Sequence, residues 1–412
     1  MNETSNKGAL DGLRVLDLSR VLAGPWASQL LADLGADVVK VERPGTGDDT
    51  RAWGPPWLND VDGESTGESA YYLCANRNKR SVAIDLSQPD GQRLVRELAS
   101  KADVLIENFK VGGLSQYGLD YASLKELNPR LIYCSITGFG QTGPYAARAG
   151  YDFLIQGMGG LMSVTGRADG TEGEGPLKVG VALTDITTGL YATVAILAAL
   201  ARRERSGAGQ HIDLALLDVQ VACLANQATN YLVGNVVPRR IGNAHPNIVP
   251  YQDFPTADGH MIIAVGNDSQ FASLCKTLGE PGWAADERFA SNAQRVKHRD
   301  QLVAMIRDTT VLRATGEWIG LMERAGVPCG PINNLSQVFV DPQVQSRNVR
   351  IEMPHPLTEQ VALVANPIRM SESPVQYRHA PPTLGQHTEE VLQDWLDLAA
   401  ADIDESHRSS PC

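Results

Sequence analysis

Asp185 is the residue whose type and surroundings most directly suggest chemistry. It is a single carboxylate where an extended segment leads into an apolar run at 192–200. Small and apolar neighbours would leave it partly desolvated, and two glycines would let a ligand come close: Val181, Ala182, Leu183, Ile186, Gly180 and Gly189. A carboxylate in such a place can act as a covalent nucleophile. An ordinary helix N-cap is an equally open interpretation, because Asp accepts hydrogen bonds from the first N–H groups of a helix.

The apolar run after Asp185 predicts a helix. It is far shorter than the roughly 20 residues that cross a bilayer, and Arg202, Arg203 and Arg205 follow it. We therefore expect this helix to be buried in the core of the protein.

The elements that must position these residues begin with two strands and a helix. Residues 13–18 predict a buried strand, 26–34 a helix and 37–42 a second strand. Such a βαβ unit implies a parallel sheet, and parallel sheets bind ligands at the carboxyl ends of their strands. The candidate binding residues at these ends are Arg20, Val21 and Ala23 after the first strand and Arg43 after the second. No GxGxxG pattern is present, so NAD is not implied.

Further strands are expected at 81–86, 104–106 and 131–136. A glycine-rich loop follows the last of them and leads to Arg148, which is well placed to meet a phosphate. The polar stretch 239–251 has no clear period and indicates a linker. We predict an α/β protein with a Rossmann-like parallel-sheet large domain at 1–224, a linker at 225–250 and a smaller α+β domain at 251–327.

Composition limits the classes of partner. The 412 residues carry a formal net charge of −12, which argues against nucleic acid or an anionic membrane surface as a partner. The six cysteines are scattered without metal-ligand spacing, so we expect free thiols and no metal site. The segment Met1–Gly8 resembles neither a signal peptide nor a presequence, and we expect a cytoplasmic protein.

Several motifs, taken together and in order, resemble the class III CoA-transferases, the family of formyl-CoA transferase. They cover nearly the whole chain: Leu10–Leu18 with Ala23–Pro25, Ala75–Ser81, Glu107–Phe109, Gly138–Pro144, the Asp185 segment and Gly326–Pro331. The resemblance implies that residues 328–412 return to the large domain and that two chains form an interlocked homodimer. It also implies that Ile84, Asn108 and Phe109 belong to the CoA cleft, together with the loops after the first strands.

The resemblance also implies a mechanism. Asp185 would attack an acyl-CoA thioester, pass through an aspartyl anhydride and an aspartyl-CoA thioester, and transfer CoA to a free carboxylic acid. Coenzyme A would then be part of a substrate, and no permanently bound cofactor is expected. Such a site must stabilise oxyanions and exclude water.

Tyr151 separates two activities within this family. Members that racemise 2-methylacyl-CoA carry a His at this position as one of two acid/base groups. The usual pKa of Tyr is too high for it to replace His readily. The substitution therefore favours acyl transfer over racemisation.

Other segments resemble most closely a branch that uses dicarboxylates and moves CoA from succinyl-CoA to glutarate: Arg43–Arg51, Asn230–Leu232, Ala244–Gln252 and Pro331–Asn334. The unreacted carboxylate of a dicarboxylate needs a cation or several donors. Our candidates are Asn243, His245 and Asn267, together with Arg20, Arg239 and Arg240. His245 is an equally good candidate for a structural residue bonded to its own loop. Itaconate, malate and mesaconate remain alternatives. The absence of the tetraglycine lid of formyl-CoA transferase argues against formyl and oxalyl substrates.

Overall fold

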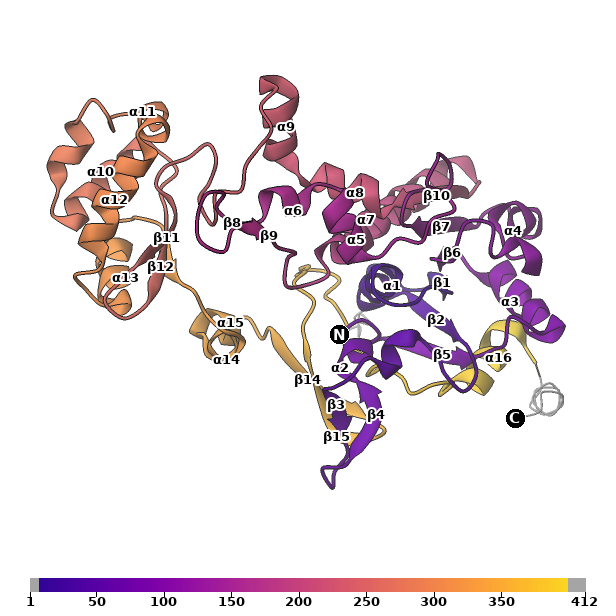
Figure 1. Cartoon of the computed structure of the whole chain (residues 1–412). Coiled ribbons are helices and arrows are strands. Elements are labelled where there is room, and N and C mark those ends of the chain that lie inside the picture. The colour runs from indigo at the N-terminus through magenta and orange to yellow at the C-terminus, as the bar shows by residue number, and fades with distance from the viewer. Residues whose placement is uncertain (1–6, 399–412) are drawn as a thin grey trace. The chain divides into compact units, whose positions relative to one another are not determined.

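The computed structural model describes residues 7–398, which form two compact units (Figure 1). The larger unit comprises the described residues up to 161, 179–229 and those from 344 onward. The smaller unit comprises 162–178 and 230–343. The expectation that Met1–Gly8 is not a targeting segment concerns residues that lie mostly outside this range. Cys412, one of the six cysteines expected to be free, also lies outside it.

A six-stranded parallel sheet forms the centre of the larger unit. Its strands lie in the order β10 (Gln210–Ala215), β7 (Ile132–Thr137), β6 (Val104–Glu107), β1 (Arg14–Asp17), β2 (Asp37–Glu42) and β5 (Lys79–Ala83). Every neighbouring pair is parallel. The predicted α/β class with a parallel sheet is therefore confirmed, and the strand carboxyl ends all lie at one edge.

Helices cover both faces of this sheet. Alternate side chains of each strand point to opposite sides, so a strand with apolar residues at successive positions needs a packing partner on each face. Val15 faces a core shared with α1 (Ala23–Asp33) and α7 (Leu183–Ser206). Leu16 faces the opposite core, shared with α3 (Pro89–Lys101), α4 (Tyr121–Leu127) and α16 (Thr388–Leu396). Burial on both faces explains the apolar run Val104–Ile106 in β6, whereas the edge strand β10 alternates and is partly exposed.

The helix α7 is longer than the apolar run that predicted it. It has 24 residues and alone among the described helices has the length and apolar character that could cross a membrane. Ala192, Ile196 and Ala199 are fully or almost fully buried in the core beside α1. We therefore interpret α7 as a core helix, in keeping with the prediction from its apolar run.

The remaining elements of the larger unit surround the sheet. They are η1 (Asp49–Ala52), β3 (Trp57–Asn59), β4 (Ser65–Ser69), α2 (Ala70–Leu73), η2 (Ser115–Tyr117), α5 (Asp152–Met158), α8 (Leu216–Cys223), β14 (Arg350–His355) and β15 (Thr358–Val364). The hairpin β14–β15 packs Met353 and Val361 against Tyr72 and Leu73. This hairpin, α16 and the segment between them belong to the larger unit, and in that segment Arg378 donates to the Ala32 and Ala36 carbonyls at the end of α1.

The smaller unit contains an antiparallel sheet of β11 (Tyr251–Pro255), β12 (His260–Ala264) and β13 (Cys329–Pro331). Its helices are α10 (Asp268–Leu278), η3 (Pro281–Ala285), α11 (Asn292–Lys297), α12 (Arg299–Thr310), α13 (Thr315–Arg324) and α14 (Leu335–Val340). A short ribbon of β8 (Gly166–Arg167) and β9 (Gly175–Pro176) also belongs to it. Phe254, Phe271, Phe289 and Trp318 fill its core.

The observed division of the chain differs from the expected boundaries. Three helices lie at or across the junctions between the units: α6 (Leu161–Val164), α9 (Ala225–Gly234) and α15 (Pro342–Ser346). The smaller unit continues to Gln343 instead of ending at 327. The pairing of β13 with β12 brings the residues just beyond 327 into this unit. It also includes 162–178, which the sequence analysis assigned to the large domain.

Candidate active site

Asp185 lies in the first turn of α7 and does not cap it. The N-cap position is Ala182, and the helix begins at Leu183. The first N–H groups of a helix have no acceptor within the helix. Here another carboxylate binds them: Asp152 Oδ1 accepts from the Thr184 N–H at 2.8 Å and from the Asp185 N–H at 3.4 Å. The N-cap interpretation of Asp185 is therefore wrong, and its carboxylate is left for another role.

The environment of the Asp185 carboxylate disfavours its ionised form. The residue is only 8% exposed, and no donor within residues 7–398 bonds to its oxygens. Burial, followed by the nearby charge of Asp152, raises the pKa of Asp185 from its usual 3.8 to about 7. Such a carboxylate is unusually basic for Asp, and perturbed groups of this kind are typical of functional sites.

Asp152 is itself held in place by a buried amide. Gln156, which is fully buried, donates from Nε2 to Asp152 Oδ2 at 2.7 Å. Gln156 Oε1 accepts from the Val179 N–H at 2.9 Å, so the same side chain fixes the segment that leads into α7. These bonds link the start of α5 to the start of α7 and fix the backbone that carries Asp185.

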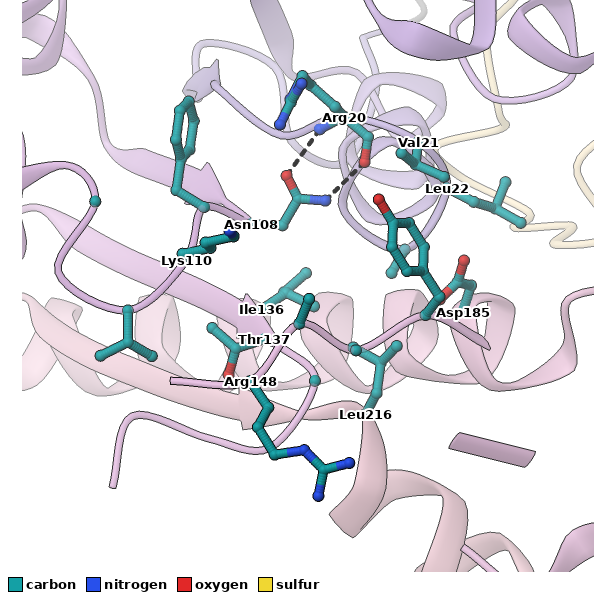
Figure 2. Close-up of a pocket in the computed structure, with 18 of the residues that line it drawn as sticks. Arg20, Val21, Leu22, Asn108, Lys110, Ile136, Thr137, Arg148, Asp185 and Leu216 are labelled. Atoms are coloured by element: carbon teal, nitrogen blue, oxygen red, sulfur yellow. Dashed lines mark hydrogen bonds between the residues drawn. The ribbon is translucent and has the colours of Figure 1, made fainter. Parts of the chain in front are cut away.

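A cavity of about 370 Å³ lies beside Asp185. Figure 2 shows Arg20, Asn108, Arg148 and Asp185 around this space. Six of the residues predicted to bind CoA line it together with Asp185: Arg20, Val21, Ala23, Asn108, Phe109 and Arg148. All of them belong to the larger unit.

A second cavity of about 360 Å³ adjoins the first. Arg43 and Ile84, the other two predicted CoA-binding residues, line it. Arg20, Phe109 and Tyr117 line both cavities, so the two spaces share a wall. The tertiary structure thus brings all eight predicted residues to one edge of the sheet, although their contact with CoA stays a prediction.

The loop after β1 is fixed by Asn108 (Figure 2). The Arg20 N–H donates to Asn108 Oδ1 at 2.9 Å, and Asn108 Nδ2 donates to the Arg20 carbonyl at 2.7 Å. The Arg20 guanidinium lies 2.9 Å from Asp49 and 5.8 Å from the centre of the Phe109 ring. The amide of Asn108 thus binds protein backbone, and the Arg20 charge is already paired.

The glycine-rich loop after β7 closes on itself by direct backbone contact. A Cβ added at Gly150 would lie 2.4 Å from the Cα of Gly138, so neither position has room for a side chain. Arg148 stands on this loop with its guanidinium 4.5 Å from the centre of the Tyr145 ring and 5.1 Å from that of Phe139. Arg148 therefore lines the cavity from this loop, with its guanidinium held beside two aromatic rings of the same loop.

Comparison with known proteins identifies the family. Residues 10–388 match CoA-transferase family III. The chain belongs to this family. It is accordingly a CoA-transferase, as the sequence motifs predicted.

Curated relatives of this CoA-transferase match over almost its whole length. A succinate–glutarate CoA-transferase of Agrobacterium fabrum is 54% identical over 390 residues, which are 95% of this chain and 96% of the relative. A human succinyl-CoA:glutarate CoA-transferase is 44% identical over 96% of this chain and 88% of the relative. The crystal structure of a CaiB/BaiF family protein from Brucella suis is 50% identical, with a TM-score of 0.83, and covers 94% of this chain and 100% of that one.

In this CoA-transferase the arrangement suits nucleophilic attack by a carboxylate. Asp185 lines a cavity from the first turn of α7, and its own burial strengthens the electrostatic interactions of its carboxylate. Tyr151, the residue that favours acyl transfer over racemisation in the sequence analysis, lines the same cavity. In the described part of the chain no three His, Cys, Asp or Glu side chains gather as a metal site.

Three of the residues predicted to bind the distal carboxylate lie in the smaller unit as follows. Asn243 donates to Asp253 at 3.0 Å, and Asn267 caps α10 by accepting from the Gln270 N–H at 2.9 Å. The Nδ1 atom of His245 accepts from the Asn247 N–H at 3.1 Å, which is the structural role that the sequence left open. A role of these residues toward substrate stays a prediction.

Sequence reasoning missed Asp152 as part of the site. Its bond to the Thr184 N–H joins residues 32 positions apart, and no local pattern announces such a contact. The available signal was indirect: an acidic residue at the start of a helix, next to the informative Tyr151. The charged residues behind the loop after β1, Lys40 and Asp48, were missed for the same reason.

Proposed function

We propose that this enzyme transfers CoA from succinyl-CoA to glutarate or a similar small dicarboxylate. The observation that carries the proposal is the basic, unpartnered carboxylate of Asp185 in a cavity lined by the predicted CoA-binding residues. The activities for which the two relatives above are named support the choice of acids. Itaconate, malate and mesaconate are the alternative acceptors to be compared with glutarate.

In the proposed reaction, an Asp185 oxygen attacks the thioester carbon, and the C–S bond breaks to give a mixed anhydride and CoA thiolate. The thiolate then attacks the Asp185 acyl carbon, which forms an aspartyl-CoA thioester and releases succinate. The acceptor carboxylate attacks the carbonyl carbon of that thioester. This step gives a second anhydride, between Asp185 and the acceptor, and releases the CoA thiolate again. Attack of the thiolate on the acceptor's carbonyl carbon completes glutaryl-CoA and regenerates Asp185.

The environment of Asp185 supports both halves of this cycle. The high pKa makes its carboxylate a better nucleophile than an ordinary Asp, while a usable fraction is ionised at neutral pH. Burial protects the anhydrides from water. Asp152 keeps the backbone of the first turn in place through its bond to the Thr184 N–H.

CoA would extend along the two adjoining cavities. We assign its thioester end to the cavity beside Asp185 and its nucleotide end to the cavity with Arg43 and Ile84. Arg43 and Arg148 are the cations that we assign to its phosphates, since the Arg20 charge is paired with Asp49. Asn243, His245 and Asn267 remain our candidates for the distal carboxylate.

We further propose that the enzyme works as a cytoplasmic homodimer. A single chain leaves many large apolar side chains exposed, which a second copy could cover. Among the most exposed are Leu232, Val233, Val236, Val237, Leu312 and Leu335. Size-exclusion chromatography with light scattering would test the dimer, and a monomeric mass at micromolar concentration would contradict it.

The deciding experiment is a mass-spectrometric screen. Purified enzyme with succinyl-CoA is offered glutarate, itaconate, malate, mesaconate or oxalate, one at a time. We expect glutaryl-CoA from the wild type and no product from Asp185→Ala, while Asp62→Asn, which alters an exposed carboxylate outside both cavities, retains turnover. Normal turnover by Asp185→Ala would refute the mechanism. Loss of α-deuterium from a 2-methylacyl-CoA without any acceptor acid would point to racemisation instead.

A further inference from the structure

The loop that follows β1 contains a backbone conformation that its sequence disfavours. Val21 has φ of +72°, in the left-handed region that β-branched residues rarely occupy. Val21 lines the cavity beside Asp185, and the preceding residue, Arg20, lines both cavities. Strained residues persist only where their surroundings hold them, and they gather at functional sites.

Side chains hold five successive backbone polar groups of this loop. The Ser19 N–H donates to Asp17 at 2.9 Å, and the Ser19 carbonyl accepts from Lys40 Nζ at 2.7 Å. The N–H and carbonyl of Arg20 both bond to Asn108, as described above. The Val21 N–H lies 3.2 Å from each oxygen of Asp48.

Lys40 and Asp48 form the buried base of this arrangement. Both side chains are fully buried, and Lys40 Nζ lies 2.9 Å from Asp48 Oδ2. Thr50 donates to Asp48 Oδ1 from its N–H at 3.0 Å and from its hydroxyl at 2.8 Å, which orients the carboxylate. Buried charges are expensive unless paired, and this pair is joined to the two peptide units that flank Arg20.

We propose that Lys40 and Asp48 are positioning residues that hold the strained loop after β1 in the shape that receives CoA. This inference rests on the proposed placement of CoA in the two cavities. Asp48 compensates for the unfavourable φ of Val21 by binding its N–H, and Lys40 fixes the preceding carbonyl. The two charges act through the loop, and neither needs to touch the reacting atoms.

The test is the affinity for free CoA, measured by isothermal titration calorimetry, because it does not depend on acyl transfer. Asp48→Asn should raise the Kd about tenfold, equivalent to about 1.4 kcal/mol. In steady-state assays the KM for succinyl-CoA should rise while kcat changes much less. The matched control is Asp33→Asn, which neutralises another fully buried carboxylate, paired with Arg77 at 2.6 Å. It should lower stability without changing the Kd.

A double-mutant cycle tests the strain itself. Glycine adopts positive φ without strain, so in a Val21→Gly background Asp48→Asn should raise the Kd by about threefold or less. Equal losses in both backgrounds would overturn the strain argument. An unchanged Kd in Asp48→Asn would overturn the positioning role while leaving the transferase reaction intact. Failure of the wild type to bind CoA would instead refute the proposed CoA site.

A milder variant keeps the test decisive if Asp48→Asn does not fold. Thr50→Val preserves shape and removes only the hydroxyl that orients Asp48. It should weaken CoA binding about twofold to threefold, in keeping with the loss of one modest hydrogen bond. An unchanged Kd in this variant would count against the proposal.

Discussion

Replacing Asp185 by Asn should abolish CoA transfer and at the same time stabilise the folded protein, most strongly above neutral pH. The amide has nearly the shape of a protonated carboxyl and cannot ionise. The wild-type carboxyl must ionise in a buried site that has no hydrogen-bond donor for it in the described part of the chain. The proposed nucleophile is therefore expected to lower stability.

The magnitude follows from the pKa. Folding raises the pKa of Asp185 from 3.8 to about 7, so the folded protein favours the protonated form. That preference stabilises the fold fully below about pH 4 and is lost as the pH rises through about 7. With about 1.36 kcal/mol per pKa unit, the ionised carboxylate destabilises the fold by up to about 4 kcal/mol above pH 8. The gain from Asn should therefore grow with pH, from about 2 kcal/mol at pH 5.5.

Urea unfolding of both proteins at intervals between pH 5.5 and 8.5 measures this gain directly. The free energy of unfolding of the variant minus that of the wild type is plotted against pH. Asp49→Asn is the control, because it removes an exposed carboxylate from the same cavity. We expect a flat line for the control and a rising line that levels off for Asp185→Asn.

A flat line for Asp185→Asn, or a variant less stable than the wild type throughout, would refute the reasoning. It would mean that the Asp185 carboxylate finds donors or water in solution, and that its pKa is close to that of an ordinary Asp. The proposed nucleophile would then lack the basicity that the mechanism requires of it.

Three further predictions concern the surroundings of the site. Asp152→Asn removes the charge that helps to raise the pKa of Asp185. In the wild type we expect kcat/KM to rise with pH near pH 7, and in the variant this rise should move to lower pH. A pH profile of kcat/KM that does not shift would contradict this prediction. Asn108→Ala removes two hydrogen bonds from the loop after β1 and should raise the KM for succinyl-CoA about tenfold with a smaller change in kcat, as steady-state kinetics will show. Gly150→Ala places a Cβ 2.4 Å from a backbone carbon and should lower the free energy of unfolding by about 1–3 kcal/mol. The control Gly282→Ala, whose added Cβ has no atom within 4 Å, should leave stability unchanged. Equal melting temperatures of the two variants would contradict the close contact at Gly150.

The sequence alone was sufficient for the class of fold and for the choice of Asp185 as candidate nucleophile. Strands buried on both faces and an amphipathic helix between them are local patterns, and they predicted the parallel sheet that the structure shows. The motifs placed the chain in its family without any knowledge of tertiary contacts. Because a parallel sheet gathers its strand ends at one edge, residues as distant as Arg20, Ile84 and Asn108 could be expected near one another.

Tertiary structure alone decided how Asp185 is tuned and how its neighbours are held. The bond from the Thr184 N–H to Asp152 spans 32 positions, and that from the Val21 N–H to Asp48 spans 27. The pairing of β13 with β12 likewise carries the smaller unit past residue 327. A local pattern reports burial and periodicity along a segment. The pKa of a carboxylate and the strain of a loop depend instead on groups that only chain folding brings within hydrogen-bond distance.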